Sequence, residues 1–180
     1  MTELPPQPEF FAPLPERESG SERQLFDLDS MTDTEVTVLA EALGWAGYEM
    51  SPEGEAAADR LTAVLVGAVV QLAEREPSRG KELICRWANS GNGHQRTTAV
   101  DCAVGLAEFD YPFARKLIAY VGGTPSAGIS GDSAMFAAAE IRERGNAEQA
   151  ADLESEASGS FSRLPDGARL TPNGIQIGQP

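Results

Sequence analysis

Residues 80–84 read Gly-Lys-Glu-Leu-Ile, and residues 114–118 read Ala-Arg-Lys-Leu-Ile, at an offset of 34 positions. A third copy follows at an offset of 36, where Ala150 aligns with the small residue and Leu153 with the leucine. A repeat of this length holds two helices of roughly 12–15 residues with their turns, and one such hairpin cannot cover its own apolar face. The spacing therefore predicts stacked hairpins, in which a small residue lets two helices approach and a leucine fills the next layer.

The segments around these repeats carry helix start and stop signals. Thr32 with Glu35 is a capping box, and Ser51-Pro52 is an N-cap followed by proline at the first helical position. The second helix contains an apolar stretch broad enough to be buried nearly all round. We predict seven helices, the first ended by Gly44 and Gly47, over residues 32–43, 51–74, 78–88, 94–108, 111–122, 131–143 and 147–158.

One turn supplies a family resemblance. Residues 143–150 (Glu-Arg-Gly-Asn-Ala-Glu-Gln-Ala) resemble the inter-helix turn of tetratricopeptide-type repeats, and the resemblance covers about residues 60–157. The family's aromatic residue near the start of the first helix is missing, and Asp101-Cys102 replaces its Leu-Gly pair in the second copy. Residues 96–100 are equally similar to a HEAT-like repeat. Either family implies an all-α fold, a short right-handed α-solenoid of about three helical hairpins plus an N-terminal helix; an irregular bundle is the alternative.

Both ends of the chain lie outside the predicted helical-repeat domain of residues 31–158. Residues 1–30 contain five prolines before Glu16 and seven acids against two arginines, so we expect an acidic, proline-rich tail. Residues 159–180 are rich in glycine and proline and predict an irregular C-terminal tail with a turn at residues 164–167. A short hairpin there is only weakly signalled.

The charge of the chain limits its partners. It has 28 acidic and 14 basic residues, a formal net charge of −14. Nucleic acids and anionic membranes attract clustered positive charge, so we expect neither as a partner. The longest apolar run, residues 61–73, is about 13 residues, against roughly 20 for a membrane span. The N-terminus has no basic or apolar region typical of a signal peptide, and we therefore expect a cytoplasmic location.

No catalytic or metal-binding constellation is recognisable. His94 is the only histidine, and together with Cys85 and Cys102 it lacks the fourth ligand that structural zinc sites need. Residues 122–131 are rich in glycine and serine and precede a helix, which could hold an anion, but they lack the Gly-Lys-Ser/Thr end of a P-loop. We expect no catalytic residue, no metal and no cofactor. An enzyme with an anion site at residues 122–131 is an alternative.

Basic residues cluster between residues 75 and 116 of this acidic chain. In a solenoid, Lys81 and Arg115 occupy equivalent repeat positions and face the same way. We therefore predict a basic stripe that binds an acidic peptide or tail, formed by Arg79, Lys81, Arg96, Arg115 and Lys116. Ordinary surface charge that balances neighbouring acids is the alternative.

A second candidate contact lies in the N-terminal tail, where Leu25, Phe26 and Leu28 stand among acidic residues. Alternating apolar and acidic residues are common in short motifs that dock into grooves. The alternative is packing on this chain's own helices, including a form in which the segment lies on the basic stripe.

The periodicity and the lack of assembled chemistry favour a non-catalytic protein–protein interaction module that binds a peptide or protein partner through a helical groove. The alternative is a structural subunit of a larger bacterial or phage assembly, whose tails become ordered against neighbouring subunits. A bacterial source is expected because twelve arginines stand against two lysines, a bias typical of GC-rich genomes; a salt-adapted organism is the alternative explanation of the composition.

Overall fold

A computed structural model describes residues 26–49, 51–123, 132–158 and 164–177. In these ranges the chain is mostly helical, and the prediction of an all-α fold is confirmed at that level. The elements are α1 (Asp33–Glu49), α2 (Pro52–Arg75), α3 (Pro77–Ala88), α4 (Gly93–Leu106), α5 (Tyr111–Gly123), α6 (Asp132–Glu143), α7 (Ala147–Ser158), β1 (Ala168–Thr171) and β2 (Gly174–Ile177).

The first two helices begin at the capping groups predicted from the sequence. The Glu35 backbone N–H donates to Thr32 Oγ1 at 3.3 Å, and Glu35 Oε2 accepts from the Thr32 backbone N–H at 2.7 Å. Before α2, Ser51 Oγ accepts from the Gly54 backbone N–H at 3.4 Å. These bonds satisfy backbone donors that have no partner inside the helix.

The prediction that Gly44 and Gly47 end the first helix near Leu43 is wrong, because α1 continues to Glu49. Gly44 has a packing role instead. A Cβ at this position would lie 2.6 Å from the Cβ of His94, so the glycine lets α1 approach the start of α4. This tertiary contact offsets the roughly 1 kcal/mol that a glycine costs inside a helix.

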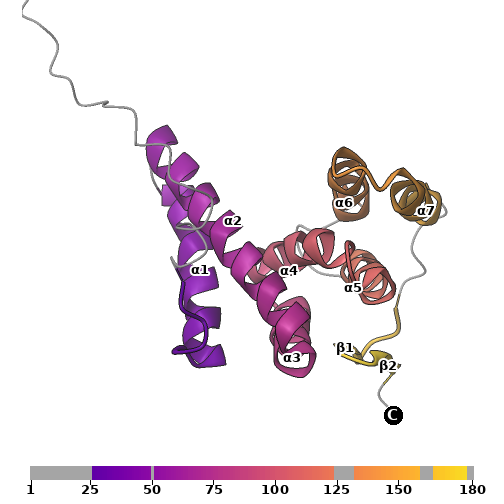
Figure 1. The fold of residues 1–180 in the computed structure, drawn as a ribbon, viewed down its shortest axis with the longest axis horizontal. Coiled ribbons are helices and arrows are strands. Elements are labelled where there is room, and N and C mark those ends of the chain that lie inside the picture. Colours follow the sequence, from indigo (N-terminus) through magenta and orange to yellow (C-terminus); the bar gives the residue numbers. More distant parts are fainter. Residues whose placement is uncertain (1–25, 50, 124–131, 159–163, 178–180) are drawn as a thin grey trace, which may run out of the picture.

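Helix α4 lies at the centre of the molecule (Figure 1). It contacts α1, α2, α3, α5 and α6, and nine of its fourteen residues are buried. Helices α1 and α2 pack together at one end, and α6 and α7 form a pair at the other. The core is therefore continuous from one helix pair to the next through α4.

The small residues and leucines of the sequence repeat occupy matching positions in α3, α5 and α7. Each small residue is buried near the start of its helix and donates its backbone N–H to the residue four positions earlier, at 3.0–3.1 Å. Each leucine, three positions further on, is 0% exposed. The small residues are Gly80, Ala114 and Ala150, and the leucines are Leu83, Leu117 and Leu153. The offset read from the sequence thus marks one structural position in three helices.

The C-terminal residues differ from the irregular tail expected for residues 159–180, because β1 and β2 form an antiparallel hairpin. At the end of α3, Asn89 Nδ2 donates to the Leu170 carbonyl at 2.8 Å, and Asn89 Oδ1 accepts from the Leu170 N–H at 2.9 Å. From α5, Tyr120 Oη donates to the Ala168 carbonyl at 3.1 Å. The hairpin depends on partners far away in sequence, which is why its own residues signal it weakly.

We predict opposite effects of adding a methyl group at two helical glycines. A Cβ at Gly80 would lie 2.3 Å from the Cα of Ala73, so Gly80→Ala must push α2 and α3 apart and should lower the free energy of unfolding by roughly 2–3 kcal/mol. A Cβ at Gly67 in α2 would meet nothing within 4 Å, so Gly67→Ala should raise it by up to about 1 kcal/mol. Urea unfolding followed by circular dichroism measures both. Equal effects of the two substitutions would contradict the close contact of α2 with α3.

Candidate functional site

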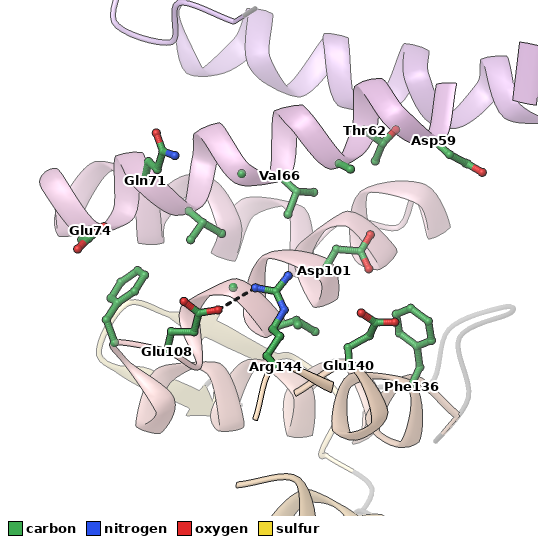
Figure 2. A pocket seen from close by; sticks show the side chains of 16 residues that line it. Asp59, Thr62, Val66, Gln71, Glu74, Asp101, Glu108, Phe136, Glu140 and Arg144 are labelled. Carbon is green, nitrogen blue, oxygen red and sulfur yellow. Dashed lines mark hydrogen bonds and ion pairs between the residues drawn. The ribbon is translucent and has the colours of Figure 1, made fainter. Parts of the chain in front are cut away.

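A pocket of about 780 Å³ opens between α2, α4 and α6; we call it the α2–α4–α6 pocket (Figure 2). Its apolar lining comes from all three helices and from the turn after α4. These apolar residues are Ala63, Val66, Gly67, Val70, Val104, Gly105, Phe109 and Phe136. Phe109 and Phe136 are 43% and 54% exposed, so large apolar side chains stand open to solvent at this surface.

Helix α2 contributes to the pocket because its apolar residues cover more than one face. Leu65, Val69 and Leu72 are buried in the core, whereas Val66 and Val70 are only partly buried and line the pocket. The prediction that this helix is buried nearly all round is therefore wrong. Only five of its 24 residues are buried, because α4 and α6 leave one apolar face uncovered.

Two glycines shape the floor of the pocket. A Cβ at Gly105 in α4 would lie 2.8 Å from Val70 Cγ2, so this glycine brings α4 close to α2. At Gly67 an added Cβ would meet nothing within 4 Å. The contact between Gly105 of α4 and Val70 of α2 therefore closes the pocket at that point, whereas the pocket is open to solvent at Gly67 in the middle of α2.

Carboxylates dominate the polar lining, which holds five acidic residues and one basic residue. The basic residue is Arg144, whose Nη1 lies 2.9 Å from Glu108 Oε1. The dashed line in Figure 2 marks this ion pair. The other four acids take part in no ion pair within the described residues. They are Asp59, Glu74, Asp101 and Glu140. The lining therefore has a formal charge of −4, five acids against one base.

The acids are divided between the two ends of the pocket. Asp59, Asp101 and Glu140 lie toward one end, and Glu74 and Glu108 lie toward the other (Figure 2). The first group comes from three different helices, α2, α4 and α6. No member of this group has an ion-pair partner among the described residues, whereas at the other end Glu108 pairs with Arg144 and only Glu74 is left without one.

Asp101 is the acid most affected by these surroundings. Burial against the core and repulsion by the Glu140 carboxylate raise its pKa from an ordinary 3.8 to about 6. Asp59 lines the same pocket, and Asp59, Asp101 and His94 also line an adjoining pocket of about 460 Å³. A carboxylate held in this way destabilises the folded protein unless a cation reaches it.

Two residues of the predicted basic stripe are paired with acids of neighbouring helices. Lys81 on α3 forms an ion pair with Asp110, just before α5. Arg115 on α5 reaches α7, where its Nε lies 2.9 Å from Asp152 Oδ2 and its Nη2 lies 2.5 Å from Glu156 Oε1. The two residues occupy equivalent repeat positions and each reaches the next helix pair. Their charges link one pair to the next.

Arg79 is paired with the N-terminal segment. Its Nε lies 3.1 Å from Asp33 Oδ1, and its Nη2 donates to the carbonyls of Leu28 and Met31 at 3.0 and 2.8 Å. The guanidinium thus satisfies backbone acceptors just before α1 and joins this segment to α3.

The remaining two residues of the stripe lie in different environments. Arg96 is 3% exposed, donates from Nη2 to the Val121 carbonyl at 3.0 Å, and has its pKa lowered by burial. Lys116 is exposed and lies beside Gly174 of β2. The structure does not bring the five basic residues together as one exposed surface, and an acidic partner for them stays a prediction.

The N-terminal apolar segment lies against the chain's own helices in its described part. Phe26 packs on the core and Leu28 is 5% exposed, while Arg75 Nη2 holds Asp29 Oδ1 at 2.5 Å. Leu25 lies outside the described residues, as do residues 124–131 of the candidate anion site. Residues 26–29 therefore pack on the protein's own helices, which was the alternative for this segment. Docking of the segment into another protein remains a prediction.

The two cysteines are buried free thiols, and burial raises the pKa of Cys85 to about 12. A thiol with so high a pKa is a poor nucleophile and a poor metal ligand at neutral pH. Among the residues that the structure describes, no cluster of three or more His, Cys, Asp or Glu side chains could hold a metal ion.

Helix α2 also has the length and composition of a membrane span, and it is the single such helix in the described part of the chain. It has 24 residues with a mean hydropathy of 1.5 over its most apolar window, because the helix extends beyond residues 61–73 at both ends. One helix of this kind is weak evidence for a membrane, since core helices of other proteins meet the same criteria. The cytoplasmic location stays a prediction.

Fold and pocket together define a mostly helical protein with an acidic, apolar-floored pocket across three helices. No family model matches this chain, and neither a curated protein nor a solved structure matches it. The tetratricopeptide-like or HEAT-like assignment therefore stays a prediction.

Sequence reasoning missed the α2–α4–α6 pocket, although the repeat carries a signal for it. Several lining residues recur at the offsets of 34 and 36 that align α2, α4 and α6. One series is Val70, Val104 and Glu140, and another is Glu74, Glu108 and Arg144. Repeat positions that carry apolar or charged residues in all three copies, outside the positions that build the core, mark a shared surface.

We predict that Asp101→Asn stabilises the protein in a pH-dependent way. The carboxyl ionises near 3.8 in the unfolded chain and near 6 in the folded protein, so the folded state loses stability as pH rises through this range. Removal of the charge should raise the free energy of unfolding by about 2 kcal/mol near pH 7.5, and the gain should vanish near pH 4. Urea unfolding at several pH values measures it. Glu82→Gln, on an exposed position of α3, is the control; a gain from Asp101→Asn that does not change with pH would contradict the buried charge.

Proposed function

We propose that this chain is a non-catalytic protein-binding module built as a short right-handed α-solenoid. In this proposal α2–α3, α4–α5 and α6–α7 are three stacked hairpins, and α1 is an N-terminal helix against the first two. The matching positions of the small residues and leucines support the stacking. So do the ion pairs of Lys81 and Arg115, each of which joins one hairpin to the next.

The observation that carries the function is the composition of the α2–α4–α6 pocket. Helix α2, the turn after α4 and helix α6 contribute apolar side chains that stay open to water, including Phe109 at 43% and Phe136 at 54% exposure. Burial of such surface against a partner is favourable by about 25 cal/mol per Å². The lining holds no histidine, cysteine, serine or lysine, so binding accounts for it better than catalysis does.

A role as a subunit of a larger assembly is the second candidate, and a separate surface favours it. Val38 and Trp45 stand seven positions apart on α1 and are 60% and 54% exposed. Residues at this spacing lie on the same side of a helix. Neither residue lines the α2–α4–α6 pocket, so a second contact at α1 is compatible with the first.

Two tryptophan substitutions test the binding role. Gly67→Trp places an indole at the pocket from a position where an added Cβ meets no atom within 4 Å, and Gly91→Trp places the same side chain in the loop between α3 and α4, where an added Cβ also meets none. We expect both variants to fold. In affinity capture from the source organism with quantitative mass spectrometry, a partner held by the wild type and Gly91→Trp should fall roughly tenfold or more with Gly67→Trp. Retention of every captured protein by a folded Gly67→Trp variant would refute the pocket as the binding site.

A further inference from the structure

We propose that the occupant of the α2–α4–α6 pocket is a cationic amphipathic helix of a partner protein, with one lysine or arginine seated between Asp101 and Glu140. This inference rests on the proposed binding role and specifies the chemistry of the partner. It reverses the sign of the partner charge predicted from the sequence, because the basic residues are largely paired within the chain and the acids of the pocket are not.

The shape and chemistry of the pocket favour a helix as occupant. The lining extends along α2 from Asp59 to Glu74, about 22 Å at the rise of an α-helix, which matches a helix of about 15 residues. The floor offers apolar side chains of helices whose backbone groups are already hydrogen-bonded. An extended peptide would leave its own backbone groups unsatisfied there, whereas a helix satisfies them internally.

The sign of the charge selects among occupants. The pocket lining has four more acids than bases, so a basic segment is attracted to it. Residues 1–25 of this chain hold five acids against two arginines, and a second copy of the chain carries −14, so both are repelled. A small cation without apolar groups would leave Phe109 and Phe136 exposed. A basic segment with an apolar face can pair with the acids and also cover the apolar residues of the lining.

The end of the pocket at Asp101 is the place for a basic side chain. Asp101 and Glu140 belong to adjacent helices, α4 and α6, and Asp59 lies at the same end (Figure 2). None of these carboxylates has an ion-pair partner in the described chain, and Asp101 is partly buried. An ammonium or guanidinium group from outside would neutralise a repulsion that the free protein retains.

The test uses three fluorescent helical peptides of about 15 residues and anisotropy at roughly 0.15 M salt, where weak surface attraction is screened. The first peptide has a leucine face and a lysine face, the second replaces its lysines with glutamates, and the third replaces its leucines with glutamines. We expect the first to bind, the second not to bind, and the third to bind at least roughly tenfold more weakly.

Matched charge variants locate the basic subsite. The double substitution Asp101→Asn with Glu140→Gln should weaken binding of the leucine–lysine peptide by roughly tenfold or more. Glu82→Gln with Glu148→Gln removes the same charge from exposed positions of α3 and α7, and should change affinity less than about threefold. Equal losses in the two double variants would show attraction to overall charge only and would overturn the inference.

Other outcomes separate the inference from the binding role. If the glutamate peptide binds as well as the lysine peptide, or if light scattering finds a dimer that Gly67→Trp dissociates, the cationic helix is wrong. If Gly67→Trp removes a captured partner but no lysine peptide binds, the binding role stands and only the cationic helix falls. If the lysine peptide binds Gly67→Trp as tightly as wild type, the peptide binds outside the pocket and the cationic helix falls, whereas the binding role falls only if Gly67→Trp also retains every captured protein.

Discussion

Gly80 lets the backbones of α2 and α3 touch, because a Cβ at that position would lie 2.3 Å from the Cα of Ala73. Helix α4 packs against both α2 and α3, and Leu83, three positions after Gly80, is 0% exposed in the core. Ala114 and Ala150 occupy the same position in the later pairs and are equally buried. The pocket is lined by other residues, mainly on α2, α4, α6 and the turn after α4.

Charge is sorted in a way that follows from this packing. Arg79, Lys81 and Arg115 neutralise acids at the junctions between elements, where partial burial strengthens each pair. The pocket is lined mainly by α2, α4 and α6, where Arg144 is the single basic lining residue and burial and Glu140 raise the pKa of Asp101 to about 6. In a chain with twice as many acids as bases, four acids without an ion pair among the described residues thus lie beside exposed apolar side chains. Such a surface suits a partner that is both basic and apolar.

The sequence predicted the structure correctly where local signals determine it, and failed where contacts between residues far apart in the chain determine it. The capping groups at Thr32 and Ser51 and the repeat leucines predicted helix starts and buried positions correctly. Gly44 was misread because its contact with His94, fifty residues away, is invisible to a local pattern. The C-terminal hairpin depends in the same way on Asn89 and Tyr120. The pocket was missed because the apolar residues of α2 outnumber what its core contacts cover, and composition alone does not say which face stays open.

The most direct measurement of the central claim is a pH titration of the Asp101 side-chain carboxyl by carbon-13 NMR, in the free protein and with the leucine–lysine helix bound. Burial and Glu140 should give a pKa near 6 in the free protein, and a seated lysine should lower it toward the ordinary value of 3.8. An ordinary pKa in the free protein, or a raised pKa that the bound helix leaves unchanged, would contradict the claim that Asp101 is an unpaired carboxylate that a basic side chain of the partner neutralises.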